Sequence, residues 1–245
     1  MTTLTDTAFT ALQLLTQLDP VLWSIVGRSL WVSVLATAIA CSLGVILGAW
    51  LGVARFVGRD GLLTVLNTLL ALPSVVVGLL VYLLLSRTGP LGYLGWLFSL
   101  KAMVLAQAVL VLPVVAALTR QSVEDAERSH GEQLQSLGAQ PWLRSVLLAW
   151  DERYALLTVL IAAFGRAISE VGAVMVVGGN IEGFTRVMTT AIALETSKGD
   201  LPLALALGFV LMSVVLLLNV CIFALRRWRQ RIDGSGVDPV QGMLV

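Results

Sequence analysis

A charged pair inside an otherwise apolar segment is the part of the sequence best suited to chemistry. Arg166 and Glu170 are the only charged residues between Ala155 and Val177, a stretch long enough to cross a bilayer. Residues four apart share one face of a helix, so the two side chains can pair. A charge at the bilayer centre costs about 2.5 to 3.5 kcal/mol on insertion scales, so both should face protein or a water-filled path.

Two interpretations of this pair stay open. In the first, it is a gate or pathway element in which Arg166 attracts an anion. Glu170 partly neutralises Arg166, which favours transient passage over a tight permanent site. In the second, it is a structural ion pair that fixes helix packing.

A proline marks a second place where the backbone can line a path. Pro73 and Ser74 lie within the apolar segment Leu62–Leu85. Proline lacks an N–H, so it kinks a helix and frees a carbonyl, and such irregular backbone is tolerated at membrane depth only beside protein or water. We place both residues in the pathway or gate, although a kink can also serve packing alone.

Other chemistry has little support. His130 is the only histidine, and Cys41 and Cys221 sit in apolar runs without a second ligand at metal-binding spacing. We expect no catalytic residue and no metal on this chain. No G-x-x-x-x-G-K-[S/T] phosphate loop occurs, so ATP hydrolysis should belong to another chain. The net charge of +1 gives no case for a nucleic-acid partner.

The composition indicates a helical membrane protein: 58% of the 245 residues are hydrophobic and 13% are charged. A hydrocarbon core of about 30 Å needs about 20 apolar residues in a helix. Five segments meet this test: Ser29–Ala54, Leu62–Leu85, Ala102–Leu118, Ala155–Val177 and Leu201–Leu225. We therefore expect an all-α, polytopic fold with one transmembrane domain over residues 1–231 and a poorly ordered, Gly-rich tail over residues 232–245.

The distribution of cations predicts the orientation. Ten of the sixteen Lys and Arg residues follow the first, third and fifth spans. They are Arg55, Arg59, Arg120, Arg128, Arg144, Arg153, Arg226, Arg227, Arg229 and Arg231. By the positive-inside rule these segments are cytoplasmic, which places the N-terminus outside and the C-terminus inside.

The N-terminal segment predicts a short amphipathic helix on the membrane surface. Phe9, Leu12, Leu15 and Leu18 are spaced for one helical face. The segment has no basic start and no A-x-A-like cleavage site, so we do not expect it to be removed.

A polar loop of about 35 residues, Thr119 to Tyr154, is much longer than a turn between two spans requires. We expect it to divide at Gly131 and Gly138, with Leu134 and Leu137 on one side of a short helix between them. A second helix should start at Pro141 and place Trp142, Val146 and Leu147 along the membrane. Two short helices joined by a glycine turn would form a docking surface for a soluble partner.

The stretch GEQLQSLGAQPWLRSVLLAWDERYALL in this loop resembles the E-A-A-x-x-x-G coupling motif of binding-protein-dependent ABC importer permeases. Glu132 matches the acidic residue and Gly138 the glycine six positions later. Gln133 and Leu134 replace the two alanines, and Asp151 stands where many members have a proline. The resemblance implies a coupling helix that enters a groove on an ATPase subunit, with contacts from Glu132, Leu134, Leu137, Gly138, Ala139 and Trp142.

Two further stretches resemble oxyanion permeases. They are LLALPSVVVGLLVYLLLSRTGPLG and GRAISEVGAVMVVGGNIEGFTRVMTTAIALETSKGDLPLALALG. The second is most similar to the tungstate type and also similar to the molybdate type. The resemblance implies the molybdate-type permease fold and a homodimer in a bacterial or archaeal inner membrane, surrounded by lipid. It also implies two ATPase subunits that hold ATP and Mg²⁺, and a periplasmic or lipid-anchored oxyanion-binding protein.

The segment between the last two spans is too long and polar for a bare turn. Its run Val187–Leu194 is weakly amphipathic. We expect the segment to re-enter toward the pore, or to form a periplasmic rim of Asn180, Thr185 and Arg186 that receives the binding protein.

Three alternatives to a tungstate importer remain. Molybdate or another oxyanion fits the same permease, because selection is expected mainly on the binding protein. A secondary transporter or channel would use Arg166 and Glu170 as a proton or ion relay, and an intramembrane enzyme is more distant.

Overall fold

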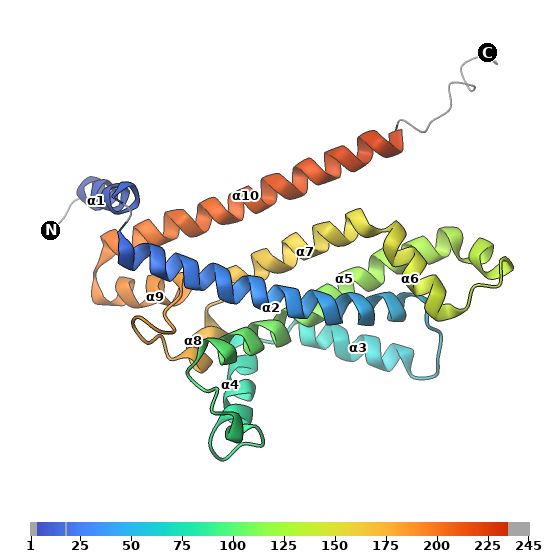
Figure 1. Cartoon of the computed structure of the whole chain (residues 1–245), viewed down its shortest axis with the longest axis horizontal. Helices are drawn as coiled ribbons and strands as arrows, with labels where there is room; N and C mark the ends of the chain where they lie inside the picture. The colour runs from blue at the N-terminus through green and yellow to red at the C-terminus, as the bar shows by residue number, and fades with distance from the viewer. Residues whose placement is uncertain (1–3, 18, 235–245) are drawn as a thin grey trace, which may run out of the picture.

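The computed structural model describes residues 4–17 and 19–234, and the regular elements in these residues are helices (Figure 1). In chain order they are α1 (Leu4–Thr16), α2 (Pro20–Val53), α3 (Arg59–Leu70), α4 (Ser74–Leu85), the 3-10 turn η1 (Gly92–Leu94), α5 (Leu100–Ser136), α6 (Pro141–Asp151), α7 (Arg153–Ile168), α8 (Gly172–Gly178), α9 (Met188–Lys198) and α10 (Leu201–Gly234). The expected all-α fold is confirmed. Helices α1 and α9 lie at one end of the long axis and α6 at the other.

Two long helices, α2 and α5, pack together at the centre of the molecule. Glycines recur on the side of α2 that faces α5, at Gly44, Gly48 and Gly52. A Cβ atom at Gly44 would lie 2.9 Å from the Cβ of Val115, and one at Gly52 would lie 2.8 Å from Cγ1 of Val123. Small residues at this four-residue spacing let the two backbones approach closely, as in other membrane helix pairs.

Two of the five expected spans are broken helices. The break at Pro73 agrees with the kink expected in the second span, whereas the break in the fourth span was not expected. Helices α3 and α4 meet at an angle of 102°, and α7 and α8 meet at 56°. At the first break, Pro73 has φ −60° and ψ 133°, outside the helical region, and it has no N–H to continue the helix. Within the described residues, three helices are long and apolar enough to cross a membrane, and up to five segments qualify if each bent pair is one span.

The third span continues far beyond its expected end at Leu118. Helix α5 runs without interruption through Gly131 to Ser136, so the expected division at Gly131 is wrong. A single glycine costs a helix only about 1 kcal/mol relative to alanine, which long-range packing can offset. The chain first turns at Gly138, where φ is +80°.

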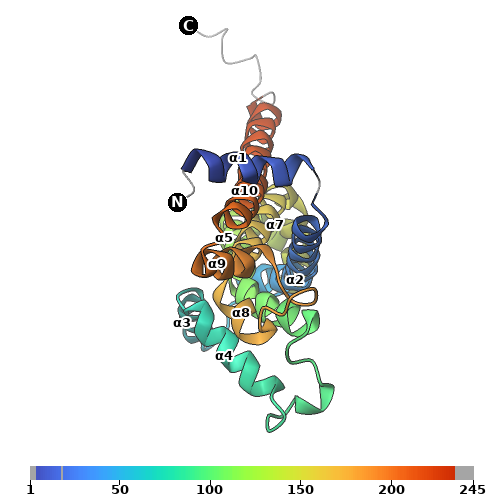
Figure 2. The ribbon, with the colours of Figure 1, turned by 90° about the vertical axis from the view of Figure 1, so that its left-hand side faces the viewer.

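The ends of the chain pack at one end of the bundle. Helix α1 lies across the start of α10 (Figure 2), and Ala11 and Leu207 are buried in the same apolar cluster. Phe9 and Leu12 are exposed on the other side of α1. The side chain of Leu15, residue 18 and residues 235–245 of the expected tail lie outside the described part of the chain, whereas residues 232–234 continue α10.

Candidate functional site

The turn between α5 and α6 is built by a glycine C-cap. Gly138 adopts a left-handed conformation, and its N–H donates to the Gln135 carbonyl at 2.9 Å. The N–H of Ala139 donates to the Leu134 carbonyl at 3.0 Å. These two bonds are the pattern of a Schellman motif, which ends a helix sharply. Pro141 then starts α6 at its first turn, as expected. Residues 119–153 thus form a helical hairpin, which we call the coupling hairpin.

The tip of the coupling hairpin presents apolar side chains to solvent. Leu137 is 82% exposed and Trp142 is 64% exposed, and Glu132 is exposed beside them. Leu134 instead packs against a buried cluster that contains Leu148. The expectation of Leu134 and Leu137 on one side is therefore wrong, because α5 ends before Leu137 and the chain has begun to turn there.

An ion pair holds the two arms of the hairpin together. Arg144 Nη1 on α6 lies 3.0 Å from Glu127 Oε1 on α5, and both side chains are 13% exposed. Gly131 makes room for this pair, because a Cβ there would lie 2.8 Å from the Glu127 carboxyl carbon. A paired and largely buried carboxylate resists separation, so the hairpin should move as one unit.

A second ion cluster anchors the hairpin to the membrane helices. The Glu124 carboxylate on α5 pairs with Arg120, with Arg128 at 3.2 Å, and with Arg59 at the start of α3 at 3.3 Å. Arg59 also donates to the Leu51 carbonyl near the end of α2, at 3.1 Å. Sequence reasoning missed Glu124, Glu127 and Arg144 as structural residues. The four-residue spacing of Arg120, Glu124 and Arg128 was the available signal.

The expected pairing in the fourth span is present. Arg166 Nη1 donates to Glu170 Oε2 at 2.7 Å. Glu170 is 3% exposed and lies beyond the end of α7, in the break before α8. Its other carboxylate oxygen accepts the Ala173 N–H at 3.1 Å, and its carbonyl accepts the Thr189 hydroxyl at 2.7 Å. Glu170 therefore holds together the three segments that meet at the break.

The two broken helices meet at their breaks. A Cβ at Gly172 would lie 2.7 Å from the Ser74 hydroxyl, which directly follows Pro73, and a Cβ at Gly78 would lie 2.7 Å from the Ala173 Cα. The structure thus gathers Pro73, Ser74, Arg166 and Glu170 at one junction.

Helix α5 touches the same junction. The buried Gln107 side chain donates to the Ala167 carbonyl at 2.9 Å, next to the break. Met103 and Ala106 of α5 are buried in the same cluster as Val174 and Val177 of α8. One continuous helix therefore connects the junction to the coupling hairpin.

The loop between α8 and α9 turns its polar side chains inward. Thr185 is fully buried, and its hydroxyl donates to the Gly178 carbonyl at 2.6 Å. Asn180 donates to the Thr190 carbonyl at 3.3 Å. Arg186 is 8% exposed and lies 3.6 Å from Glu195. Asn180 and Arg186 thus tie the loop to α9, and Thr185 ties the loop to the end of α8. Helix α9 includes most of the run Val187–Leu194 that was expected to be amphipathic. Within the described residues, no group of three or more His, Cys, Asp or Glu side chains is placed to hold a metal ion.

The chain is similar to known transport proteins over most of its length. Residues 44–231 match the family described as binding-protein-dependent transport system inner membrane component, and this range includes both broken spans and the coupling hairpin. The chain is 42% identical over 217 residues to the tungstate uptake system permease protein TupB of Peptoclostridium acidaminophilum, covering 88% of this chain and 95% of that protein. It is 40% identical over 163 residues to TupB of Campylobacter jejuni, covering 66% of this chain and 68% of that protein. It is 32% identical over 192 residues to the molybdenum transport system permease protein ModB of Escherichia coli, covering 73% of this chain and 82% of that protein.

The matched range contains the elements described above, from the last part of α2 to most of α10. Proteins of this family are transport components of the inner membrane. The chain belongs to the family of binding-protein-dependent transport system inner membrane components.

Proposed function

We propose that this chain is the membrane-spanning subunit of an ATP-driven importer for tungstate. The observation that carries the proposal is the 42% identity to a tungstate uptake permease across 95% of that protein's length. The molybdenum permease of Escherichia coli shares 32% identity over a smaller part of the chain, so molybdate is the second candidate. Tungstate and molybdate are both tetrahedral oxyanions with two negative charges, so one membrane pathway could carry either ion. A soluble binding protein would then select between them.

The coupling hairpin is the proposed contact with an ATPase subunit. Its tip offers exposed Leu137 and Trp142, large apolar groups that suit the core of a protein interface. Glu132, Gly138 and Ala139 surround them, and Leu134 supports the tip from within. The buried Glu127–Arg144 pair supports the idea of a rigid hairpin, because a push is transmitted only if the two arms keep their geometry.

Helix α5 is the proposed route from the ATPase to the pathway. It has 37 residues and is therefore about 55 Å long at 1.5 Å per residue. One end forms the hairpin arm, and the other packs on α8 beside the Arg166–Glu170 junction. A displacement of the hairpin would move α5 against the break between α7 and α8. Breaks of this kind are natural hinges, because fewer backbone hydrogen bonds cross them.

The junction at Pro73, Ser74, Arg166 and Glu170 is the proposed gate. The Arg166 side chain is 41% exposed whereas that of Glu170 is 3% exposed, so the cation is the more accessible member of the pair. An accessible arginine can attract a passing dianion, while Glu170 keeps its place in the break. Two copies of the chain would supply two arginines to one path between them.

The remaining partners follow from the family and the cation distribution. We place the hairpin in the cytoplasm with two ATPase subunits, which would hold ATP and Mg²⁺; the permease itself needs no cofactor. The opposite end would meet a periplasmic or lipid-anchored oxyanion-binding protein at the loop that Asn180, Thr185 and Arg186 hold together. Because these three side chains face inward, they would shape the rim while the loop backbone makes the contact.

Reconstitution in proteoliposomes tests the function. With the ATPase subunit, the binding protein and ATP, vesicles should accumulate tungstate, and molybdate should compete less well. Leu137→Asp should abolish ATPase binding and uptake, because it buries an unpaired carboxylate in the interface. Val57→Asp is the matched control, since Val57 is also a fully exposed aliphatic residue, on the α2–α3 turn. Uptake that persists without any ATPase would overturn the proposal in favour of a secondary transporter.

A further inference from the structure

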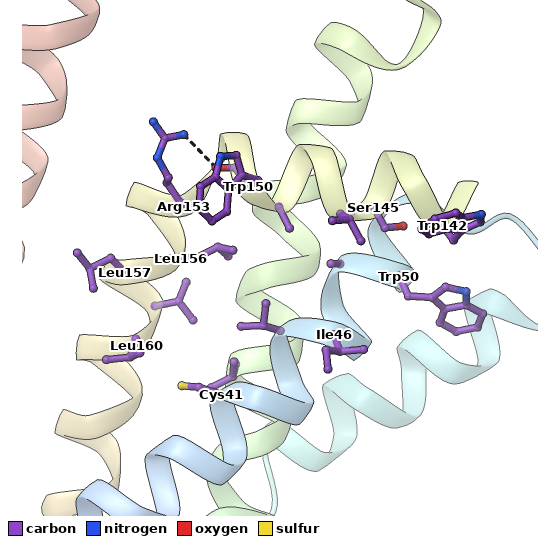
Figure 3. Close-up of a pocket in the computed structure, with 16 residues that line it drawn as sticks. Cys41, Ile46, Trp50, Trp142, Ser145, Trp150, Arg153, Leu156, Leu157 and Leu160 are labelled. Atoms are coloured by element: carbon purple, nitrogen blue, oxygen red, sulfur yellow. Dashed lines mark hydrogen bonds between the residues drawn. The ribbon is translucent and has the colours of Figure 1, made fainter. Parts of the chain in front are cut away.

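An apolar groove runs along the flank of the molecule between α2, α6 and α7 (Figure 3). Its volume is about 640 Å³, and its floor is lined by side chains such as Cys41, Val45, Val115 and Val159. Ile46 of α2 and Leu157 and Leu160 of α7 extend along its open side and are 71%, 40% and 42% exposed. The groove is thus open sideways, toward the surroundings of the bundle.

The mouth of the groove differs in character from its floor. Trp50 and Trp150 stand around it and are 43% and 73% exposed, whereas the third lining tryptophan, Trp142, belongs to the hairpin tip. Arg153 is the one charged residue in the lining (Figure 3). Tryptophan concentrates where a membrane meets water, because its ring is apolar and its N–H is polar. The mouth therefore lies at the depth of the lipid headgroups, with the floor extending toward the hydrocarbon core.

Arg153 is positioned at the mouth by contacts with a carbonyl and an aromatic ring. Its Nη1 donates to the Trp150 carbonyl at 3.1 Å, and its guanidinium lies 4.7 Å from the Tyr154 ring centroid. Among the side chains that the structure describes, no carboxylate forms a salt bridge with Arg153. Positioned guanidinium groups with free donors are well suited to a phosphate, which they bind with two parallel hydrogen bonds.

We propose that this groove binds an anionic phospholipid, with an acyl chain along α2 and α7 and the phosphate at Arg153. The occupant must combine a long apolar body with an anion at one end. A phospholipid has both parts by its chemistry, whereas a second protein would need an apolar ridge that ends in a carboxylate at the same depth. The lipid would lie between α2 and the α6–α7 corner, beside the coupling hairpin.

Lipid titration of the full chain, followed by native mass spectrometry, tests the proposal. The probes are dioleoylphosphatidylglycerol, dioleoylphosphatidylcholine and free glycerol phosphate, which carries the anion without the chain. Phosphatidylglycerol should bind the wild type more tightly than the other two. Arg153→Gln should weaken its binding at least tenfold, because the two parallel charge-assisted hydrogen bonds to the phosphate are lost. Val146→Trp, which fills the groove from an exposed position, should prevent retention of the lipid.

Arg55→Gln is the matched control, because Arg55 is an exposed arginine near the end of α2 that does not line the groove. It should leave lipid binding unchanged. Thermal unfolding of each variant, with and without lipid, separates lost binding from lost folding. Equal lipid binding by the wild type and both groove variants would overturn the proposal. So would a change in oligomeric mass in Val146→Trp with lipid binding intact, since a second copy would then be the occupant.

Discussion

At the scale of single residues, Glu170 is the most constrained charged group at the junction. Both of its carboxylate oxygens and its carbonyl have partners on three different segments. Arg166 pairs with this one carboxylate among the described residues, and its side chain is 41% exposed. The pair is therefore asymmetric: the carboxylate fixes the break, and the arginine is free enough to meet a substrate.

Replacing each member of this pair should give different results. Glu170→Gln should lower the free energy of unfolding by about 1 to 3 kcal/mol, because buried partners lose a charged acceptor. Arg166→Gln should lower tungstate uptake per folded transporter about tenfold, with a smaller loss of stability. Unfolding experiments measure the stability of both variants, and uptake into proteoliposomes, normalised to folded protein, measures transport. Arg87→Gln in an exposed loop is the control. If Arg166→Gln lowers folding yield but leaves uptake per folded molecule unchanged, the pair is structural.

At the scale of elements, the helix ends and breaks carry the functional geometry. The long α5 ends at a glycine cap, α3 and α7 end at the two breaks, and α4 and α8 begin after them. Each of these positions has a local chemical cause, such as the missing N–H of Pro73 or the positive φ of Gly138. The close seam between α2 and α5 gives these ends a fixed frame.

Gly138 should tolerate few replacements. A residue with a Cβ pays about 1 to 2 kcal/mol in the left-handed conformation, so Gly138→Ala should distort the hairpin tip. Gly138→Asn should be milder, because asparagine adopts this conformation more readily. Affinity for the ATPase subunit should fall in the order wild type, Asn, Ala, as measured by co-purification or titration. Gly61→Ala, in an open position on α3, should leave this affinity unchanged. An unchanged affinity in Gly138→Ala would contradict the role of the cap.

The α2–α5 seam should be equally sensitive at its tightest point. A Cβ at Gly48 would collide with the Ala116 carbonyl, whereas a Cβ at Gly27 on the same helix meets nothing within 4 Å. Gly48→Ala should therefore cost about 1 to 3 kcal/mol through overpacking, and Gly27→Ala should be neutral or slightly stabilising. Thermal unfolding in detergent compares the two variants. Equal unfolding temperatures for the two variants would mean that α2 and α5 can move apart without loss of stability.

At the scale of the whole molecule, the arrangement separates two ends with different chemistry. The coupling hairpin lies at one end of the long axis and the α8–α9 loop near the other, with the junction of the two broken helices between them (Figure 1). This arrangement suits a protein that receives a signal at one face of a membrane and a substrate at the other.

The proposed orientation can be measured with single cysteines. Ser197→Cys on α9 and Leu137→Cys at the hairpin tip are both exposed positions at opposite ends. In a Cys221→Ser background, an impermeant maleimide added to cells with a permeable outer layer should label Ser197→Cys. Leu137→Cys should react only after the membrane is opened, because the positive-inside rule places the hairpin in the cytoplasm. The reverse pattern would invert the topology.

Features that depend on local physical chemistry could be predicted from the amino-acid sequence. Apolar length predicted the membrane segments, the missing N–H of Pro73 predicted a disturbed helix, and the spacing of Arg166 and Glu170 predicted their pairing. The position of Gly138 predicted the turn at the hairpin tip. These features involve residues close together in the chain, where the backbone alone sets the distances.

How the breaks, the ion pairs and the helices come together depends on tertiary contacts. The tertiary structure joined the Pro73 break to the Glu170 break, paired Arg144 with Glu127, and extended α5 through Gly131. It also buried Thr185 and Arg186, which hydropathy alone would leave in solvent. Each outcome depends on contacts between residues distant in sequence. Such contacts can override the local preference of a segment, and a single sequence does not show which distant residues meet.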